Sequence, residues 1–84
     1  MTVVLHDENT IRLIGACPAE DGETLLQHLL ANRKAEVDWR GCESAHAAVI
    51  QVLLVSGRPL QGPPAGEFLR QIIGPALARS GDQI

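Results

Sequence analysis

Residues 37–54 read VDWRGCESAHAAVIQVLL, and this stretch decides the fold that the sequence predicts. Its beginning is typical of a strand over residues 35–39, followed by a tight turn at Gly41. The chain then enters a helix that is apolar almost throughout. Ser44 is predicted to cap this helix, because its hydroxyl can accept a bond from a free backbone N–H, and Gly57 is predicted to close it in a left-handed conformation.

The residues before this stretch predict a hairpin and a first helix. Residues 3–6 and 10–15 have the pattern of short strands, and the polar residues 7–9 between them predict a turn. Pro18 and the acidic residues after it favour a helix start, since proline is tolerated in the first turn and acids favour the positive end of the helix dipole. The leucines that recur at helical spacing and are expected to be buried are Leu25, Leu26, Leu29 and Leu30.

The residues after this stretch predict a weak strand and a third helix. Residues 58–62 are a strand candidate that should be short or lie at an edge, because Pro59 cannot donate to a ladder. The third helix follows Pro63 and Pro64, and Gly74-Pro75 is expected to kink or terminate it. Its apolar positions are Phe68, Leu69, Ile72, Ile73 and Leu77.

The predicted order is strand, strand, helix, strand, helix, strand, helix. Strands that alternate with helices favour an α/β (α+β) fold, here a small mixed sheet of about four strands with three helices packed on it. The 84 residues are expected to form a single domain over residues 1–79, with a flexible tail over residues 80–84. Trp39 and Phe68 are the only aromatic residues, and both are expected in an otherwise aliphatic core.

The stretch 37–54 resembles the core of the sulfate-transporter and anti-sigma-factor-antagonist (STAS) domain. In that family a strand ending in Asp, a hydrophobic residue and often Ser-Gly leads through a loop into a helix. In the regulated members this helix opens with a phosphorylatable Ser or Thr. The resemblance aligns Asp38 with the strand-end Asp and Gly41 with the small residue of the turn. It places His46 where the family usually has Asp, and Ala47 at the phosphoacceptor position.

This resemblance implies a non-enzymatic protein–protein interaction module. The expected partner is an anti-sigma factor or kinase, or alternatively a subunit of a membrane transporter. Phosphorylation cannot switch the module at Ala47, because alanine has no hydroxyl. Asp38 is expected to shape the turn. The residues expected to bind the partner are Arg40, Gly41, Glu43, Ser44, His46, Ala47 and Ile50.

Composition and motifs argue against several other classes. A formal charge of −3 with no basic stripe argues against nucleic acid as a partner. The longest apolar run, residues 52–55, is too short to insert into a membrane, and the N-terminus has no signal pattern, so the expected location is cytoplasmic. Cys17 and Cys42 are expected to be reduced. The spacing of cysteines and histidines predicts no metal site, and no phosphate-binding loop or other cofactor motif is present.

Two alternatives remain open from the sequence. A small-ligand-binding domain would need a polar pocket at the strand ends that contains Asp38 and His46, whereas a flat or convex rim would favour protein recognition. Asp38 alone has no partner group for catalysis, and His46 is either a recognition contact or a surface histidine. The second helix is expected to be covered by the sheet and by neighbouring helices. If part of it is uncovered, that part would mark a partner surface or a homodimer interface.

Overall fold

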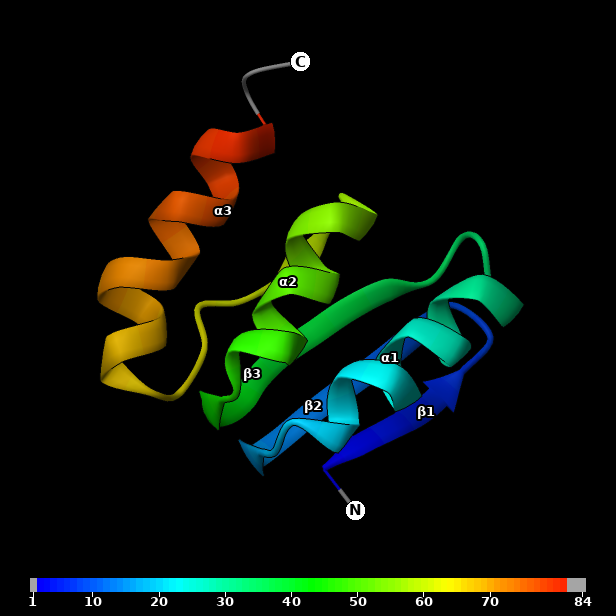
Figure 1. Ribbon diagram of the computed structural model, residues 1–84. Coiled ribbons are helices and arrows are strands. Elements are labelled where there is room, and N and C mark those ends of the chain that lie inside the picture. Colours follow the sequence, from blue (N-terminus) through cyan, green and yellow to red (C-terminus); the bar gives the residue numbers. More distant parts are fainter. Residues whose placement is uncertain (1, 82–84) are drawn as a thin grey trace.

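The computed structural model describes residues 2–81 and has the predicted order of elements (Figure 1). The strands are β1 (Val3–Asp7), β2 (Thr10–Cys17), β3 (Glu36–Ala45) and β4 (Leu60–Gln61). The helices are α1 (Glu20–Ala31), α2 (Ala47–Ser56) and a third helix that begins with a π-helical stretch, η1 (Leu69–Ile73), and continues as α3 (Gly74–Gly81). The mixed α+β fold predicted from the sequence is confirmed.

The four strands form one sheet in the order β1-β2-β3-β4. β1 and β2 are the predicted antiparallel hairpin, whereas β2, β3 and β4 run parallel to one another. β2 bends where its register with β3 shifts, on either side of the pair Gly15 and Cys42, and Gly15 has a positive φ of 72° there. A left-handed backbone conformation is accessible to glycine at little cost, so Gly15 permits this bend.

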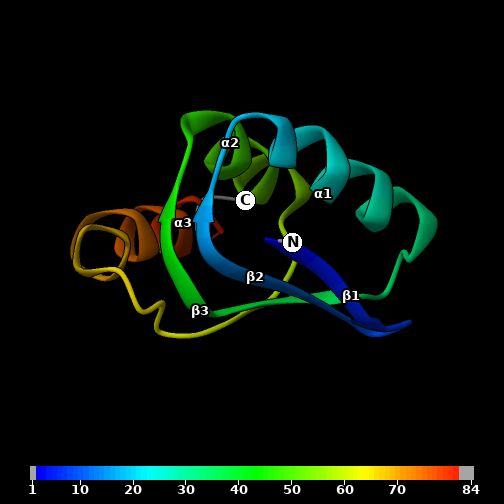
Figure 2. The same cartoon turned by 90° about the horizontal axis from the view of Figure 1, so that it is seen from below.

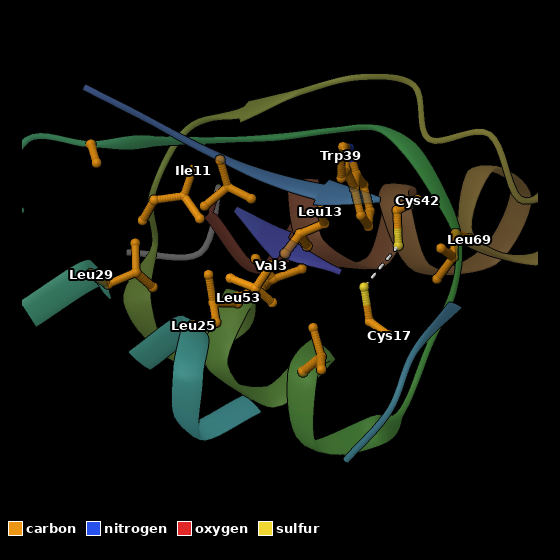
Figure 3. Close-up of a cluster of buried hydrophobic side chains, with 13 residues drawn as sticks. Val3, Ile11, Leu13, Cys17, Leu25, Leu29, Trp39, Cys42, Leu53 and Leu69 are labelled. Carbon is orange, nitrogen blue, oxygen red and sulfur yellow. Dashed lines mark hydrogen bonds between the residues drawn. The ribbon is translucent and has the colours of Figure 1, made fainter. Parts of the chain in front are cut away.

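The helices α1 and α2 lie side by side on one face of the sheet (Figures 1 and 2). The third helix lies beyond β3, and no helix in the described part of the chain covers the opposite face (Figure 2). The core fills the space between the sheet and the helices (Figure 3). Its fully or almost fully buried residues are Val3, Ile11, Leu13, Cys17, Leu25, Leu29, Ala35, Val37, Trp39, Cys42, Val49, Leu53 and Leu69.

Half of the leucine stripe predicted for α1 is not buried. Leu25 and Leu29 are in the core, but Leu26 is 43% exposed and Leu30 is 69% exposed. The reason is geometric, because a sheet beneath a helix covers only a narrow part of its circumference. Phe68, predicted as a core residue, is also 65% exposed, whereas Trp39 is buried as predicted.

The third strand continues six residues beyond its predicted end at Trp39, to Ala45, and the tight turn predicted at Gly41 is wrong. Gly41 pairs with Ile14, and Ser44 pairs with Ala16, so both belong to β3. The extended β2 supplies parallel hydrogen-bonding partners that the sequence of β3 alone does not reveal. Ser44 therefore does not cap α2. The N-cap is His46, two residues later, while Gly57 closes α2 with a φ of 63° as predicted.

Gly74-Pro75 was expected either to kink or to terminate the third helix. It does not terminate it. Proline has no N–H to donate, and in a regular α-helix its ring clashes with the carbonyl four residues earlier. In η1 the Gly74 N–H bonds instead to the Leu69 carbonyl, five residues earlier. This wider turn precedes Pro75, and the helix continues to Gly81. It thus includes Ser80 and Gly81, which were expected in a flexible tail, and residues 82–84 lie outside the described residues.

One side chain joins three elements at the end of α1. The Arg58 guanidinium donates hydrogen bonds to the carbonyls of Leu29, Asn32 and Ala35, at 2.8, 2.9 and 2.9 Å. Arg58 follows the end of α2, whereas its acceptors lie in the last turn of α1 and just before β3. It therefore satisfies carbonyls that the end of α1 leaves without intrahelical partners.

The segment that leads into the third helix approaches β3 so closely that it needs glycine. The Gly66 N–H donates to the Cys42 carbonyl at 3.0 Å. A Cβ atom at Gly66 would lie 1.8 Å from the Glu43 carbonyl oxygen, and one at Gly62 would lie 2.5 Å from the Trp39 indole nitrogen. The connection after β4 can therefore lie against β3 only because these two positions have no side chain.

Candidate partner-binding surface

The predicted binding residues Glu43, Ser44, His46 and Ala47 lie where β2 and β3 end and α2 begins, whereas Arg40 and Gly41 lie in the middle of β3. The His46 N–H donates to the Cys17 carbonyl at 2.8 Å, which joins the ends of both strands. We call this edge of the sheet the rim. Most of the predicted binding residues are exposed, namely Arg40, Gly41, Glu43, Ser44, His46 and Ala47. Ile50 is only partly exposed and packs against the core.

His46 has a structural role at the rim in addition to being exposed. Its Nδ1 accepts a hydrogen bond from the Ala48 N–H at 3.0 Å, and its backbone is extended. These are the features of an N-cap residue, here with an imidazole nitrogen in place of the usual hydroxyl or carboxylate oxygen. Because Nδ1 must carry a lone pair to accept this bond, the cap requires the neutral imidazole.

Asp38 lies near the start of β3, away from the rim, and is paired with two arginines. Its carboxylate accepts two bonds from the Arg40 guanidinium, at 3.0 and 2.9 Å, and one from the Arg40 N–H at 3.1 Å. The Arg12 Nε lies 3.9 Å from it on β2. The side-chain bond from Arg40, reinforced by its backbone N–H and by both positive charges, lowers the pKa of Asp38 to about 2 although burial opposes the shift.

Asp38 and His46 do not form one site. They are eight positions apart and the seven residues between them belong to β3, which corresponds to roughly 25 Å along an extended chain. Neither residue lines either of the two clefts described below. Asp38 thus stabilises the strand pairing through the two arginines, and His46 starts a helix.

The low pKa of Asp38 predicts a loss of stability in acid. The folded state holds this carboxyl ionised, with a pKa of about 2 against an ordinary value of 3.8. Its contribution is therefore complete above about pH 4 and is lost as the pH falls towards 2, and it amounts to about 2 kcal/mol. Urea unfolding would measure the free energy of unfolding at pH 5 and at pH 2. Between these two values, Asp38→Asn should lose about 2 kcal/mol less than wild type. A Glu8→Gln control should retain the wild-type pH dependence, and an equal dependence for Asp38→Asn would contradict the assignment.

The two cysteines lie in neighbouring strands, which the sequence spacing did not indicate. Both side chains are buried free thiols, and their Sγ atoms are 3.9 Å apart, within hydrogen-bonding distance (Figure 3). Burial raises the pKa of the Cys17 thiol, and it raises the pKa of Cys42 to about 12, helped by the neighbouring sulfur. At neutral pH almost no thiolate is present, so neither group is a prepared nucleophile.

The outer side of α2 is apolar and uncovered. Val49 and Leu53 point into the core, but Ala47 is exposed, Leu54 is 45% exposed and Val55 is 83% exposed. Ala47, Gln51 and Leu54 are spaced as i, i+4 and i+7 and form one ridge, of which Gln51 is the only polar member. The expectation that neighbouring elements would cover this helix is wrong. The alternative expectation, that part of this helix is left uncovered, agrees with the structure, which has this uncovered apolar face.

A cleft lies on each side of α2. One, between α2 and the third helix, has a volume of about 940 Å³, and its lining includes Trp39, Leu53 and Arg70. The other, between α1 and α2, has a volume of about 700 Å³, and its lining includes Leu26, Leu30 and Val55. Sequence analysis missed both clefts, although the excess of apolar residues on α1 and α2 was a visible signal.

The described residues contain neither a cluster of metal ligands nor a membrane-spanning helix. Within residues 2–81, no group of three or more His, Cys, Asp or Glu side chains is placed to hold a metal ion. No helix in this part of the chain combines the length and apolar character needed to cross a bilayer.

Comparisons of the sequence and the fold with protein-family models, curated proteins and solved structures find no match.

Proposed function

We propose that this chain is a non-enzymatic, STAS-like interaction module of the anti-sigma-factor-antagonist type. It binds another protein through the rim and the outer ridge of α2. The observation that carries the proposal is the uncovered apolar ridge of Ala47, Gln51 and Leu54, which begins directly at the rim. Exposed apolar surface bordered by polar residues is typical of protein interfaces. The polar border here is supplied by Glu43, Ser44 and His46.

The STAS assignment rests on the residues of β3 and α2 and is supported by the order of elements. Residues 37–54, which carry the resemblance, form most of β3 followed by α2, but Asp38 lies near the start of this strand and Gly41 within it, not at a strand end and in a turn. Ala47 is the first residue of α2, so the position expected to carry a phosphate has no hydroxyl. A partner that docks there meets no phosphate charge, and the module is permanently competent to bind.

A cytoplasmic location is part of this proposal. It rests on the cysteine content, since a chain with only two cysteines outside a Cys-x-x-Cys motif is typical of proteins from a reducing compartment.

The test is capture of the partner by the tagged full chain from a native cell lysate, followed by mass spectrometry. Leu54→Lys places a charge on the ridge and should reduce capture at least tenfold, because a charge buried in an apolar contact is costly. The control is Phe68→Lys, which changes an exposed apolar residue at the N-cap of η1, 65% exposed against 45% for Leu54, and should leave capture unchanged. Equal capture by wild type and Leu54→Lys, or capture of no specific protein, would overturn the proposed surface.

The identity of the captured protein separates the branches of the proposal. An anti-sigma factor or kinase would indicate signalling, whereas transporter components would indicate a regulatory subunit of a membrane complex. If a kinase is captured, incubation with it and ATP should add no phosphate to this chain. Stoichiometric labelling of Ser44, which is exposed at the end of β3, would show that the module can be switched after all.

A small-ligand-binding domain is the second candidate, and the cleft between α2 and the third helix is the observation in its favour. This cleft lies away from the rim, and its lining includes Trp39, Leu53 and Arg70. Because Trp39 is the only tryptophan, its fluorescence would report a ligand there directly. Saturable quenching by a small molecule, together with no captured protein, would favour this alternative.

A further inference from the structure

We infer that the face formed by α1 and the adjoining side of α2 is the interface of a homodimer, in which two copies pair about a two-fold axis with their α1 helices antiparallel. This interface lies on the opposite side of α2 from the cleft beside the third helix. It does not include the rim. The inference does not depend on the proposed partner, because it rests on Leu26, Leu30 and Val55 and not on Ala47 or Leu54; Gln51 borders both surfaces.

The first observation is an exposed apolar cluster on this face. Leu30 is 69% exposed and Leu26 is 43% exposed, one turn apart on α1, while Val55 on α2 is 83% exposed. All three line the same groove of about 700 Å³, and Leu29 is among the other residues that line it. The helices can form this groove because Gly22 packs against Ala48, where an added Cβ would lie 3.2 Å from Ala48 atoms. A partner that fills the groove would remove three large side chains from water.

The second observation is the arrangement of charge along α1. Glu23 stands before the two leucines and Arg33 after them, and both are exposed. Suppose that two α1 helices cross antiparallel about position 28. A residue that precedes position 28 by some number of positions then faces the residue of the second copy that follows position 28 by the same number. Leu26 then meets Leu30 of the second copy, and Glu23 comes near Arg33 of the second copy, which lies just beyond the end of that copy's α1 at Ala31. The apolar and charged positions are therefore self-complementary, as an isologous interface requires.

This self-complementarity favours a second copy over a different protein as the occupant. α1 begins with Glu20, Asp21 and Glu23 and is followed by Arg33 and Lys34, so its two ends carry opposite charge. A partner helix needs the reverse arrangement, and an antiparallel copy of α1 has it. The antiparallel helix dipoles add to the attraction, since each positive end lies near a negative end.

The test is sedimentation equilibrium of the full chain over a range of concentrations. Wild type should shift from the 9.0 kDa of one chain towards twice that mass as the concentration rises. Leu30→Lys should remain monomeric at every concentration, whereas Phe68→Lys, equally apolar and exposed but elsewhere, should dimerise like wild type. Circular dichroism would establish that each variant is folded. A wild-type chain that stays monomeric up to about 1 mM overturns the inference.

Charge reversal tests the antiparallel geometry specifically. Glu23→Arg places two arginines opposite each other at both ends of the interface, and should weaken the dimer about tenfold. Adding Arg33→Glu reverses both partners and should restore the wild-type dissociation constant. A double variant as weak as the single one would overturn the proposed pairing even if the chain dimerises. Leu54→Lys should leave dimerisation unchanged, so failure of the partner surface and failure of the dimer interface are distinguishable.

Discussion

Replacing Arg58 with alanine should lower the free energy of unfolding by about 3 kcal/mol. The guanidinium donates to the carbonyls of Leu29, Asn32 and Ala35 at 2.8–2.9 Å, and hydrogen bonds from a charged donor are worth more than neutral ones. Its removal leaves the end of α1 and the approach to β3 without these partners. Urea unfolding monitored by circular dichroism would measure the loss.

Two further arginine variants separate geometry from charge. Arg58→Lys keeps the positive charge but cannot reach three carbonyls with a planar fork, so it should recover less than half of the lost stability. Arg70→Ala is the control, because Arg70 is exposed and makes one long bond of 3.4 Å to the Ala65 carbonyl. Full stability in Arg58→Lys would mean that charge alone, not the three-way hydrogen bonding, holds the end of α1.

Gly66→Ala should be at least as damaging, with an expected loss of about 3 kcal/mol or more. The added methyl would lie 1.8 Å from the Glu43 carbonyl oxygen and 2.7 Å from the Glu43 carbonyl carbon, so the backbone of β3 leaves it no space. The chain can escape only by moving away from β3, which breaks the bond from the Gly66 N–H to the Cys42 carbonyl. Leu69, three residues later and 2% exposed, would be drawn out of the core.

The only tryptophan provides the readout for this variant. Trp39 is 3% exposed, and the third helix covers it near Gly74. If the segment moves away, the fluorescence maximum of Gly66→Ala should shift to the red while most of the sheet remains. Gly41→Ala is the matched control, because its Cβ would be 3.6 Å from the nearest atom, an ordinary contact. Equal stability of the two variants would contradict the close approach.

Local sequence signals predicted the parts of the fold that depend on local chemistry. The polar turn before Thr10, the helix start after Pro18 and the left-handed Gly57 each follow from a few adjacent residues, and the structure has all three features. The short edge strand after Pro59 was also predicted, because the missing N–H restricts where proline can pair.

The errors arose where distant segments decide the local structure. Gly41 and Ser44 have turn-forming side chains, yet both lie in β3 because β2 extends alongside and pairs with them. Likewise, the spacing of Leu26 and Leu30 indicates one face of a helix but not how much of that face the sheet covers. The role of Arg58 could not be predicted at all, since its three acceptors precede it by 23 to 29 residues.

The exposure of the rim was predicted from the sequence, but the local structure of the rim and of α2 was not. Exposure at the rim follows from where α2 begins, and Ala47 could be placed there from the sequence alone. The capping role of His46 was missed, because histidine is not among the usual N-cap residues. The exposure of one side of α2 depends on the position of the third helix. This helix lies beyond β3, which leaves a cleft between α2 and the third helix.

The two edges of the sheet determine how copies of this chain can aggregate. β4 contains only two residues and is followed by Gly62-Pro63-Pro64, in which the prolines have no N–H to offer an incoming strand. At the other edge, the β1 register is interrupted between Leu5 and Asp7. Neither edge is a long, flat template, so stacking of strands into fibrils is disfavoured. The dimer proposed above uses the helices instead, and its two-fold contact closes on itself.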